Sequence, residues 1–180
     1  QLADGGVSVD GKLIEADKVI VATGTSAVAP SIDGIDDVPY LTSTEALELD
    51  TLPNSLLVIG GGYIGCELAQ MLGRSGVSVT IVCRSRLLPE AEPEISAALT
   101  GYLRDEGIAI RDGLGYQNIR KTDDGIALDV TEGGQGVTIA AEQVLVTTGR
   151  RPNTSGMALE ENGVELLPNG GIKVDDRMRT

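Results

Sequence analysis

Three glycines stand at a fixed spacing in the segment Gly60-Gly61-Gly62-Tyr63-Ile64-Gly65. This G-x-G-x-x-G pattern follows an apolar run and opens a helix-like periodicity, the context in which it binds a dinucleotide. The first glycine allows a tight turn, the second lets a diphosphate approach the backbone, and the third lets helix and strand pack closely. Free N–H groups at the helix start favour phosphate oxygens. The pattern therefore predicts a dinucleotide site at residues 60–65. A glycine-rich turn without a ligand is the alternative.

Two arginines, Arg84 and Arg86, follow the next strand-like run. In sites of this kind an acid at this place binds the ribose 2′-hydroxyl of NAD, whereas an arginine accommodates the 2′-phosphate of NADP. Here Cys83 stands at the end of the run and no acid follows it directly. A guanidinium can bind a phosphate through two parallel hydrogen bonds. We therefore expect NADPH as the cofactor, with NADH as the alternative. A solvated turn that binds nothing is the simpler interpretation of two arginines.

The elements that must position these residues alternate between strands and helices. Strands are predicted at 56–59, 77–82 and 108–110, with helices between them that begin at Tyr63 and Pro93. The apolar residues expected on the buried sides of these helices are Ile64, Leu68, Met71 and Leu72 in the first, and Ile95, Leu99 and Leu103 in the second. Alternating segments at 116–122, 125–131 and 136–140 predict an antiparallel meander, and 144–146 a buried strand. The fold class is α/β, a Rossmann-like parallel sheet with an antiparallel β-meander.

Other segments predict structure on the N-terminal side of this unit. Residues 7–9 and 12–22 favour short strands around a turn at Asp10-Gly11, and a helix begins near residue 43, capped by Ser43 or Thr44. The runs "VIVATG" at 19–24 and "VLVTTG" at 144–149 resemble each other. This repetition suggests that the chain leaves one sheet and later returns to it, with the dinucleotide unit inserted between.

Composition excludes several classes of function. The net charge of −13 argues against nucleic-acid and anionic-membrane partners. No apolar run approaches the roughly 18 residues of a membrane-spanning helix, and a cytoplasmic location is expected. The chain has no histidine, which excludes a histidine-based zinc site or catalytic triad. Cys66 and Cys83 lie in apolar surroundings and are predicted to be core residues, so no metal site is expected. Redox chemistry must come from a cofactor or from protein outside these residues.

Three motifs in this order resemble the pyridine nucleotide-disulfide oxidoreductases. They are "VIVATG" followed by Pro30, Ile32 and Gly34, then "LLVIGGGYIGCELAQ", then "VLVTTGRRPNT". In that family an FAD domain is interrupted by an NAD(P)H domain and followed by an interface domain. The resemblance implies a fold of the FAD/NAD(P)-binding domain type, in which residues 1–40 are the end of the FAD domain and a connector. Residues 41–148 would be the NAD(P)H-binding domain, and 149–180 a truncated return toward the FAD domain.

The resemblance also implies roles for individual residues. Tyr63 would shield the flavin face where the nicotinamide docks, and Glu67 would point toward flavin and nicotinamide; exposed helix residues without a role are the alternative for both. The positions implied for NAD(P)H are Gly60, Gly61, Gly62, Tyr63, Ile64, Gly65, Glu67, Arg84, Arg86 and Gly149, and those implied for FAD are Thr23, Gly24 and Arg150. No residue of the chain is expected to be catalytic in itself.

Within the family, the segment from Pro39 to Gly65 and the final "IKVDDRMRT" are most similar to the mercuric reductase branch. That similarity implies a flavoprotein that passes hydride from NADPH to FAD, then to a cysteine pair and on to Hg(II). The FAD-binding glycine motif, the cysteine pair and the C-terminal segment of the family are missing, so we expect an inactive fragment. The rest of its own chain would be its partner, and the full-length enzyme a homodimer. The alternatives are dihydrolipoamide dehydrogenase or another disulfide oxidoreductase of the family, and a non-catalytic nucleotide-sensing module.

Overall fold

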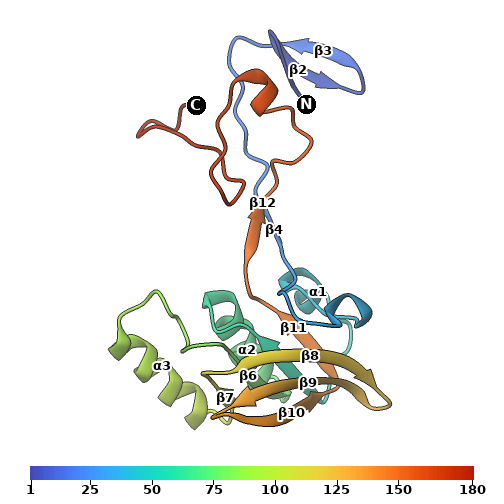
Figure 1. Cartoon of the computed structure of the whole chain (residues 1–180), viewed down its shortest axis with the longest axis vertical. Helices are drawn as coiled ribbons and strands as arrows, with labels where there is room; N and C mark the ends of the chain where they lie inside the picture. The colour runs from blue at the N-terminus through green and yellow to red at the C-terminus, as the bar shows by residue number, and fades with distance from the viewer. The chain divides into compact units, whose positions relative to one another are not determined.

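A computed structural model describes all residues, 1–180, as two compact units. Unit 1 consists of Gln1–Ser26 and Arg150–Thr180, and unit 2 is the continuous segment Ala27–Gly149. Both the glycine turn and the two arginines of the predicted site lie in unit 2, whose helices and most of whose strands are labelled in Figure 1. None of the helices has the length and apolar character needed to span a membrane.

A four-stranded parallel sheet is the centre of unit 2, and its strand order is β11-β5-β6-β7. The chain passes through β5 (Ser55–Ile59), α2 (Tyr63–Arg74), β6 (Ser78–Val82), α3 (Pro93–Asp105), β7 (Ala109–Arg111) and, after the meander, β11 (Gln143–Val146). The predicted strands and helices of this region are thus confirmed, and α2 and α3 begin at the predicted residues. Since β6 and β11 lie on opposite sides of β5, the strand order reverses beside β5. Ligands of open α/β sheets bind at the carboxyl ends of the strands at such a point.

The predicted meander is present as β8 (Gly115–Thr122), β9 (Gly125–Glu132) and β10 (Gln135–Ala141), paired antiparallel in the order β10-β9-β8 (Figure 1). It packs on one face of the parallel sheet and the helices on the other. Leu56 and Val58 of β5 belong to the cluster that contains the buried residues of α2 and α3, whereas Leu57 and Ile59 join the cluster of the meander. This alternation follows from the two-residue period of a strand.

The apolar periodicity predicts the buried faces of the two helices in part, since Leu99 and Leu103 of α3 pack in the core as expected, whereas Ile64 of α2 is exposed. In α2, Leu68 and Leu72 are buried as expected, but Met71 is 41% exposed and the small residues Cys66 and Ala69 are buried instead. Ile95 at the start of α3 is 53% exposed. Cys66 and Ala69 are buried because the third glycine of the turn, Gly65, lets this part of α2 approach the sheet closely.

The N-cap of the short helix α1 (Ser43–Leu47) lies one residue before the positions predicted for it. Thr42, and neither Ser43 nor Thr44, is the N-cap, and its hydroxyl accepts the N–H of Thr44 at 3.3 Å. Glu45 accepts the backbone N–H of Thr42 at 2.8 Å and so completes a capping box. The 3-10 turn η1 (Ile35–Asp37) precedes α1 in the connector.

Unit 1 is built from short strands. They are β1 (Leu2–Ala3), β2 (Gly6–Val9), β3 (Lys12–Glu15), β4 (Thr25–Ala27, whose last residue lies in unit 2) and β12 (Arg150–Pro152), with a 3-10 turn η2 (Glu160–Asn162). The turn at Asp10-Gly11 is confirmed, since both residues have positive φ as a type I′ hairpin turn requires. The predicted strand at 12–22 ends at Glu15. Residues 16–24 pair with no other strand, and Ile20 in this run is 91% exposed.

The two similar runs do not belong to one sheet. Val144–Val146 pairs with β5 inside unit 2, whereas Val19–Ala22 forms no strand. The prediction that "VLVTTG" marks a return to the first sheet is therefore wrong. The segment that pairs again with the N-terminal part of the chain is β12, which joins β4. An apolar run that ends in Thr-Gly specifies a buried strand, but not the sheet that it enters.

Candidate nucleotide-binding site

The glycine turn between β5 and α2 is closely packed at two of its three motif positions. Gly60 has a φ of +121°, its N–H donates to the Val82 carbonyl at 2.9 Å, and an added Cβ would lie 2.7 Å from the Thr147 carbonyl oxygen. At Gly65 an added Cβ would lie 2.3 Å from the Gly60 carbonyl oxygen. Any side chain at either position would collide with backbone, so the turn requires glycine at both.

The second motif glycine, Gly62, faces open space instead. An added Cβ there would meet nothing within 4 Å. Gly62 is the N-cap of α2, and no side chain accepts a hydrogen bond from the first turn of the helix. A bare backbone with free N–H groups at the positive end of a 12-residue helix suits a diphosphate. The residues present thus fit the phosphate groups of a dinucleotide.

A cleft opens beside this turn at the carboxyl ends of the parallel strands. It brings together the turn, the segment after β6, the start of β8 and the residues after β11. Its lining residues are Gly60, Gly61, Gly62, Cys83, Arg84, Ser85, Arg86, Pro89, Tyr116, Thr147 and Thr148. Five of the residues predicted for NAD(P)H are therefore next to one another in space, although 24 positions separate Gly60 and Arg84 in the sequence numbering.

Arg84 combines a fixed backbone with a free side chain. The carbonyls on either side of it, those of Cys83 and Ser85, accept N–H groups from Leu114 at 3.2 Å and Gly113 at 3.0 Å. The Arg84 side chain is exposed and makes no hydrogen bond or ion pair within the chain. Its guanidinium is thus available to an anion in the cleft.

Arg86 lies in the same cleft, but its guanidinium is already engaged. Nη2 of Arg86 donates to the carbonyl oxygens of Pro89 at 3.0 Å and Ala91 at 2.8 Å. The side chain is half-buried. The two predicted arginines therefore differ: one is free for a ligand, and the other is bound to the loop that follows it.

Other predicted residues lie outside the cleft. Tyr63, 63% exposed, and Glu67 lie one turn apart on the exposed side of α2. Ile64 and Gly65 belong to the same helix start but do not line the cleft, and Gly149 is exposed beyond β11.

The residues predicted for FAD gather in unit 1. The Thr23 hydroxyl donates to the Asn153 carbonyl at 2.8 Å, and the Gly24 carbonyl accepts the Asn153 N–H at 3.0 Å. Arg150 donates from Nε to the Thr25 hydroxyl at 2.7 Å and from Nη2 to the Thr25 carbonyl at 2.6 Å. Thus Asn153 and Thr25, neither of which the motifs singled out, hold the three predicted residues in place.

Six residues that line the cleft were not predicted as site residues, namely Cys83, Ser85, Pro89, Tyr116, Thr147 and Thr148. Thr147 and Thr148 directly follow the apolar strand β11, and that position at a strand's carboxyl end was a signal that could have found them. Tyr116 carries no such signal, because it comes from the meander. Its hydroxyl donates to the Val82 carbonyl at 3.0 Å, and burial raises the pKa of Tyr116 above its usual value. The Val82 carbonyl thus accepts from both Tyr116 and Gly60.

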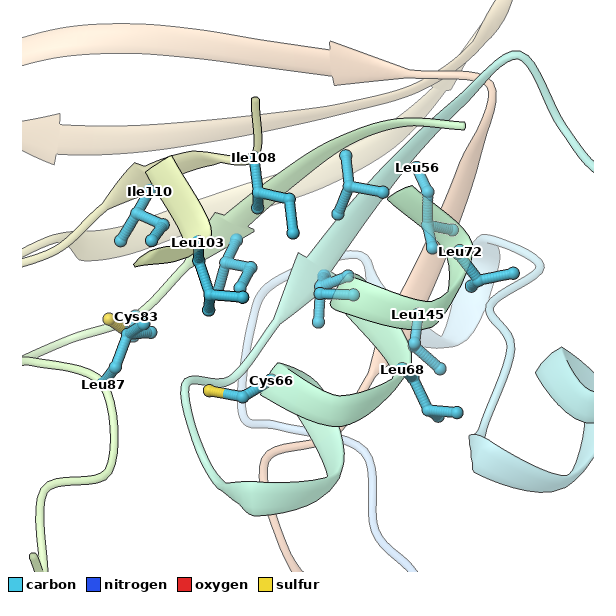
Figure 2. Packing of buried hydrophobic residues seen from close by; sticks show 14 of the residues in the cluster. Leu56, Cys66, Leu68, Leu72, Cys83, Leu87, Leu103, Ile108, Ile110 and Leu145 are labelled. Carbon is cyan, nitrogen blue, oxygen red and sulfur yellow. The ribbon is translucent and has the colours of Figure 1, made fainter. Parts of the chain in front are cut away.

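Both cysteines are buried in the core cluster that the helices share with the parallel sheet, as predicted (Figure 2). They form no disulfide, and the Cys66 thiol donates to the Gly61 carbonyl at 3.7 Å. Burial raises the pKa of each thiol to about 11. Both therefore stay protonated at neutral pH and are poor nucleophiles.

Sequence comparison finds relatives among flavin-linked reductases. The chain is 42% identical over 179 residues to the mercuric reductase of Streptomyces lividans, covering 99% of this chain and 37% of that protein. It is 44% identical over 175 residues to the mercuric reductase of Bacillus cereus, covering 97% and 28%. The dihydrolipoyl dehydrogenase of Haloferax volcanii is 38% identical over 184 residues, covering 100% and 38%. The chain thus spans between 28% and 38% of the length of these three relatives.

Structural comparison agrees with this result. The Cu(II) complex of the flavoprotein disulfide reductase RclA from Escherichia coli matches with a TM-score of 0.82 and 31% identity, covering 93% of this chain and 38% of that one. LpdA from Mycobacterium tuberculosis matches with a TM-score of 0.77 and 30% identity, covering 94% and 37%. Residues 2–180 match the sequence model of a protein family that depends on FAD and NAD(P). The chain therefore belongs to the pyridine nucleotide-disulphide oxidoreductase family.

Proposed function

We propose that this chain binds NADPH in the cleft beside the Gly60–Gly65 turn and presents it to the flavin of a longer oxidoreductase of the mercuric reductase type. The observation that carries the proposal is the free Arg84 guanidinium beside an open glycine turn. The bound cofactors would supply the redox chemistry, in which hydride passes from NADPH to FAD and electrons then reach a cysteine pair and Hg(II). The chain itself supplies binding and orientation.

The cleft and the predicted residues outside it have different tasks in this proposal. The bare backbone at Gly62 and the start of α2 hold the diphosphate, and Arg84 binds the 2′-phosphate that distinguishes NADPH from NADH. The nicotinamide then extends toward Tyr63 and Glu67 on the exposed side of α2. The proposed FAD contacts are Thr23, Gly24 and Arg150 in unit 1.

Calorimetric titration of the chain with NADPH and with NADH tests the proposal. We expect the wild-type chain to bind NADPH more tightly, because a charge-assisted guanidinium–phosphate pair strengthens binding by about tenfold or more. Arg84→Gln should remove that preference and leave NADH affinity nearly unchanged. Arg84→Glu should weaken NADPH binding further, since a carboxylate repels the 2′-phosphate.

Lys121→Gln is the matched control for charge. It removes one positive charge from an exposed residue of β8 that does not line the cleft, so it should leave both affinities unchanged. Equal weakening of NADPH and NADH by Arg84→Gln would contradict a 2′-phosphate contact. Absence of any binding by the folded wild-type chain would overturn the proposal.

Dihydrolipoamide dehydrogenase is the second candidate, and the 38% identity to the Haloferax volcanii enzyme favours it. The residues at the end of β6 do not fit dihydrolipoamide dehydrogenase, because Cys83 and Arg84 occupy the place where an acid would bind the NAD ribose. Assays of the longer protein for NADPH oxidation dependent on Hg(II), and for NADH-linked dihydrolipoamide oxidation, separate the two. A nucleotide-sensing module would contain no flavin, so the flavin content of the longer protein distinguishes this third alternative.

A further inference from the structure

We infer that Arg86 is a positioning residue of the glycine turn, which aims the Gly62 N–H at the dinucleotide, rather than a second ligand of its 2′-phosphate. The inference rests on the proposed nucleotide binding and assigns the two arginines of the cleft different tasks. Arg86 closes a loop of residues 86–91, here called the Leu88 turn.

Leu88 links this turn to the glycine turn. Its backbone N–H donates to the Gly61 carbonyl at 2.7 Å, and its side chain is buried in the core cluster of unit 2. Leu88 has a φ of +44°, in the left-handed region that a leucine rarely adopts. A backbone conformation of this kind persists only where surrounding contacts hold it.

Two side chains provide those contacts. Nη2 of Arg86 donates to the carbonyls of Pro89 and Ala91, at 3.0 and 2.8 Å, and so closes the loop around Leu88. The hydroxyl of Ser96, a buried residue of α3, donates to the Leu87 carbonyl at 2.6 Å. Arg86 and Ser96 thus fix the carbonyls on both sides of the strained residue.

The Leu88 turn in this way determines the direction of one N–H group. The Gly61 carbonyl and the Gly62 N–H belong to the same peptide plane, and in a trans peptide they point in opposite directions. Because the carbonyl is bound to Leu88, the N–H is directed away from Leu88. Gly62 lines the cleft and faces open space, so this N–H is offered to a phosphate there.

The two arginines therefore predict different binding phenotypes. The diphosphate is common to NADPH and NADH, so a change that misdirects the Gly62 N–H must weaken both. The 2′-phosphate occurs only in NADPH, so loss of its ligand must weaken NADPH alone. We expect Arg86→Gln to raise the Kd of both nucleotides by the same factor, about three- to tenfold for a partly lost hydrogen bond. Their ratio should stay at the wild-type value.

The experiment compares wild type, Arg86→Gln, Arg86→Lys and Arg84→Gln by calorimetry with both nucleotides, well below the melting temperature of each variant. Hydrogen exchange of the Leu88 amide is measured on the same proteins. Arg86→Gln should speed this exchange, whereas Arg84→Gln should not. Arg86→Lys should restore slow exchange and both affinities, because an ammonium can also donate to the two carbonyls. If Arg86→Gln does not fold, Ser96→Ala loosens the same turn and should likewise weaken both nucleotides equally.

Selective loss of NADPH binding in Arg86→Gln would overturn the inference, since Arg86 would then be a phosphate ligand. Unchanged affinities in a variant with a lower melting temperature would also overturn it, because the role would be structural only. The proposed function fails separately, when the wild-type chain binds neither nucleotide. If wild type binds and Arg86→Gln loses only NADPH, the function stands and the inference fails.

Discussion

Gly62 and Gly65 belong to one turn, but a side chain would meet different surroundings at each. Gly65→Ala places a methyl group 2.3 Å from the Gly60 carbonyl oxygen, and overpacking of this kind costs about 1–3 kcal/mol of stability. Gly62→Ala meets no neighbour and should change the free energy of unfolding by less than about 1 kcal/mol. It should nevertheless weaken both nucleotides by about tenfold or more, because its methyl group occupies the proposed path of the diphosphate.

Chemical denaturation and calorimetry on these two variants separate folding from binding. Gly101→Ala is the control, since this exposed glycine of α3 also has open space for a Cβ and lies outside the cleft. A Gly62→Ala chain that binds NADPH as well as wild type would place the diphosphate elsewhere.

At the scale of single residues, the glycine motif and the arginines after β6 predicted part of the cleft. The spacing of the glycines and the arginine after β6 led to Gly60, Gly62 and Arg84, because local chain geometry alone brings a βαβ turn and the next strand end together. Tyr116 could not be found in this way, since a long-range packing of β8 against β6 brings it there. Nor could sequence separate Arg84 from Arg86, because only the positions of nearby carbonyls decide which guanidinium is free.

Helices α2 and α3 are joined at their C-terminal ends by one ion pair. Arg74 donates from Nε and Nη2 to the two carboxylate oxygens of Glu106, both at 2.7 Å, and Gln70 adds a third bond at 2.8 Å. The hydrogen bond from Arg74 lowers the pKa of Glu106 below its ordinary value of 4.5. A lowered pKa in the folded state stabilises the protein above the unfolded value, and this contribution is lost as the pH falls through the folded value.

Glu106→Gln should therefore lower the melting temperature of unit 2 modestly at pH 7, and the difference from wild type should vanish in acid, well below pH 4.5. Asp105→Asn, a neighbouring exposed carboxylate without an ion pair, is the control and should show no such pH-dependent difference. Thermal unfolding followed by circular dichroism at a series of pH values measures both. A Glu106→Gln difference that persists in acid would contradict an ionic origin.

Elements with strong local signals were predicted well, and elements that depend on distant partners were not. The limits of α2 follow from Gly62 before it and Gly76, with a φ of +95°, after it. The run Val19–Ala22 is as apolar as a buried strand, yet it pairs with nothing in the chain. The 3.6-residue period of α3 identified a helix, but whether Ile95 is buried depends on what packs against that face.

The two units of the molecule differ in how much core they contain. All but one of the buried hydrophobic residues lie in unit 2, where they form two clusters on the faces of the parallel sheet, and the exception is Leu159 in unit 1. Apolar burial is the main source of folding free energy. We therefore expect unit 1 to open at a lower free energy than unit 2.

Hydrogen exchange resolved by residue tests this expectation. Amides of β2 and β3 should exchange faster than those of β5 and β6 under native conditions. A concentration of NADPH near 100 times its Kd should slow the exchange of β5 and β6, because it stabilises the unit that binds it by about 2.7 kcal/mol. The exchange of β2 and β3 should not respond. Equal protection of both pairs of strands would contradict the difference in core.

Strand β5 has a hydrophobic layer on each face, since Leu56 and Val58 pack toward the helices and Leu57 and Ile59 toward the meander. Adding or deleting a single residue before Gly60 would exchange these faces and displace the turn along the strand by about 3.3 Å. The hairpin turn at Gly133-Gly134 carries no such restriction. Natural length variation in proteins with this unit should accumulate in the meander turns, while the number of residues in β5 stays constant.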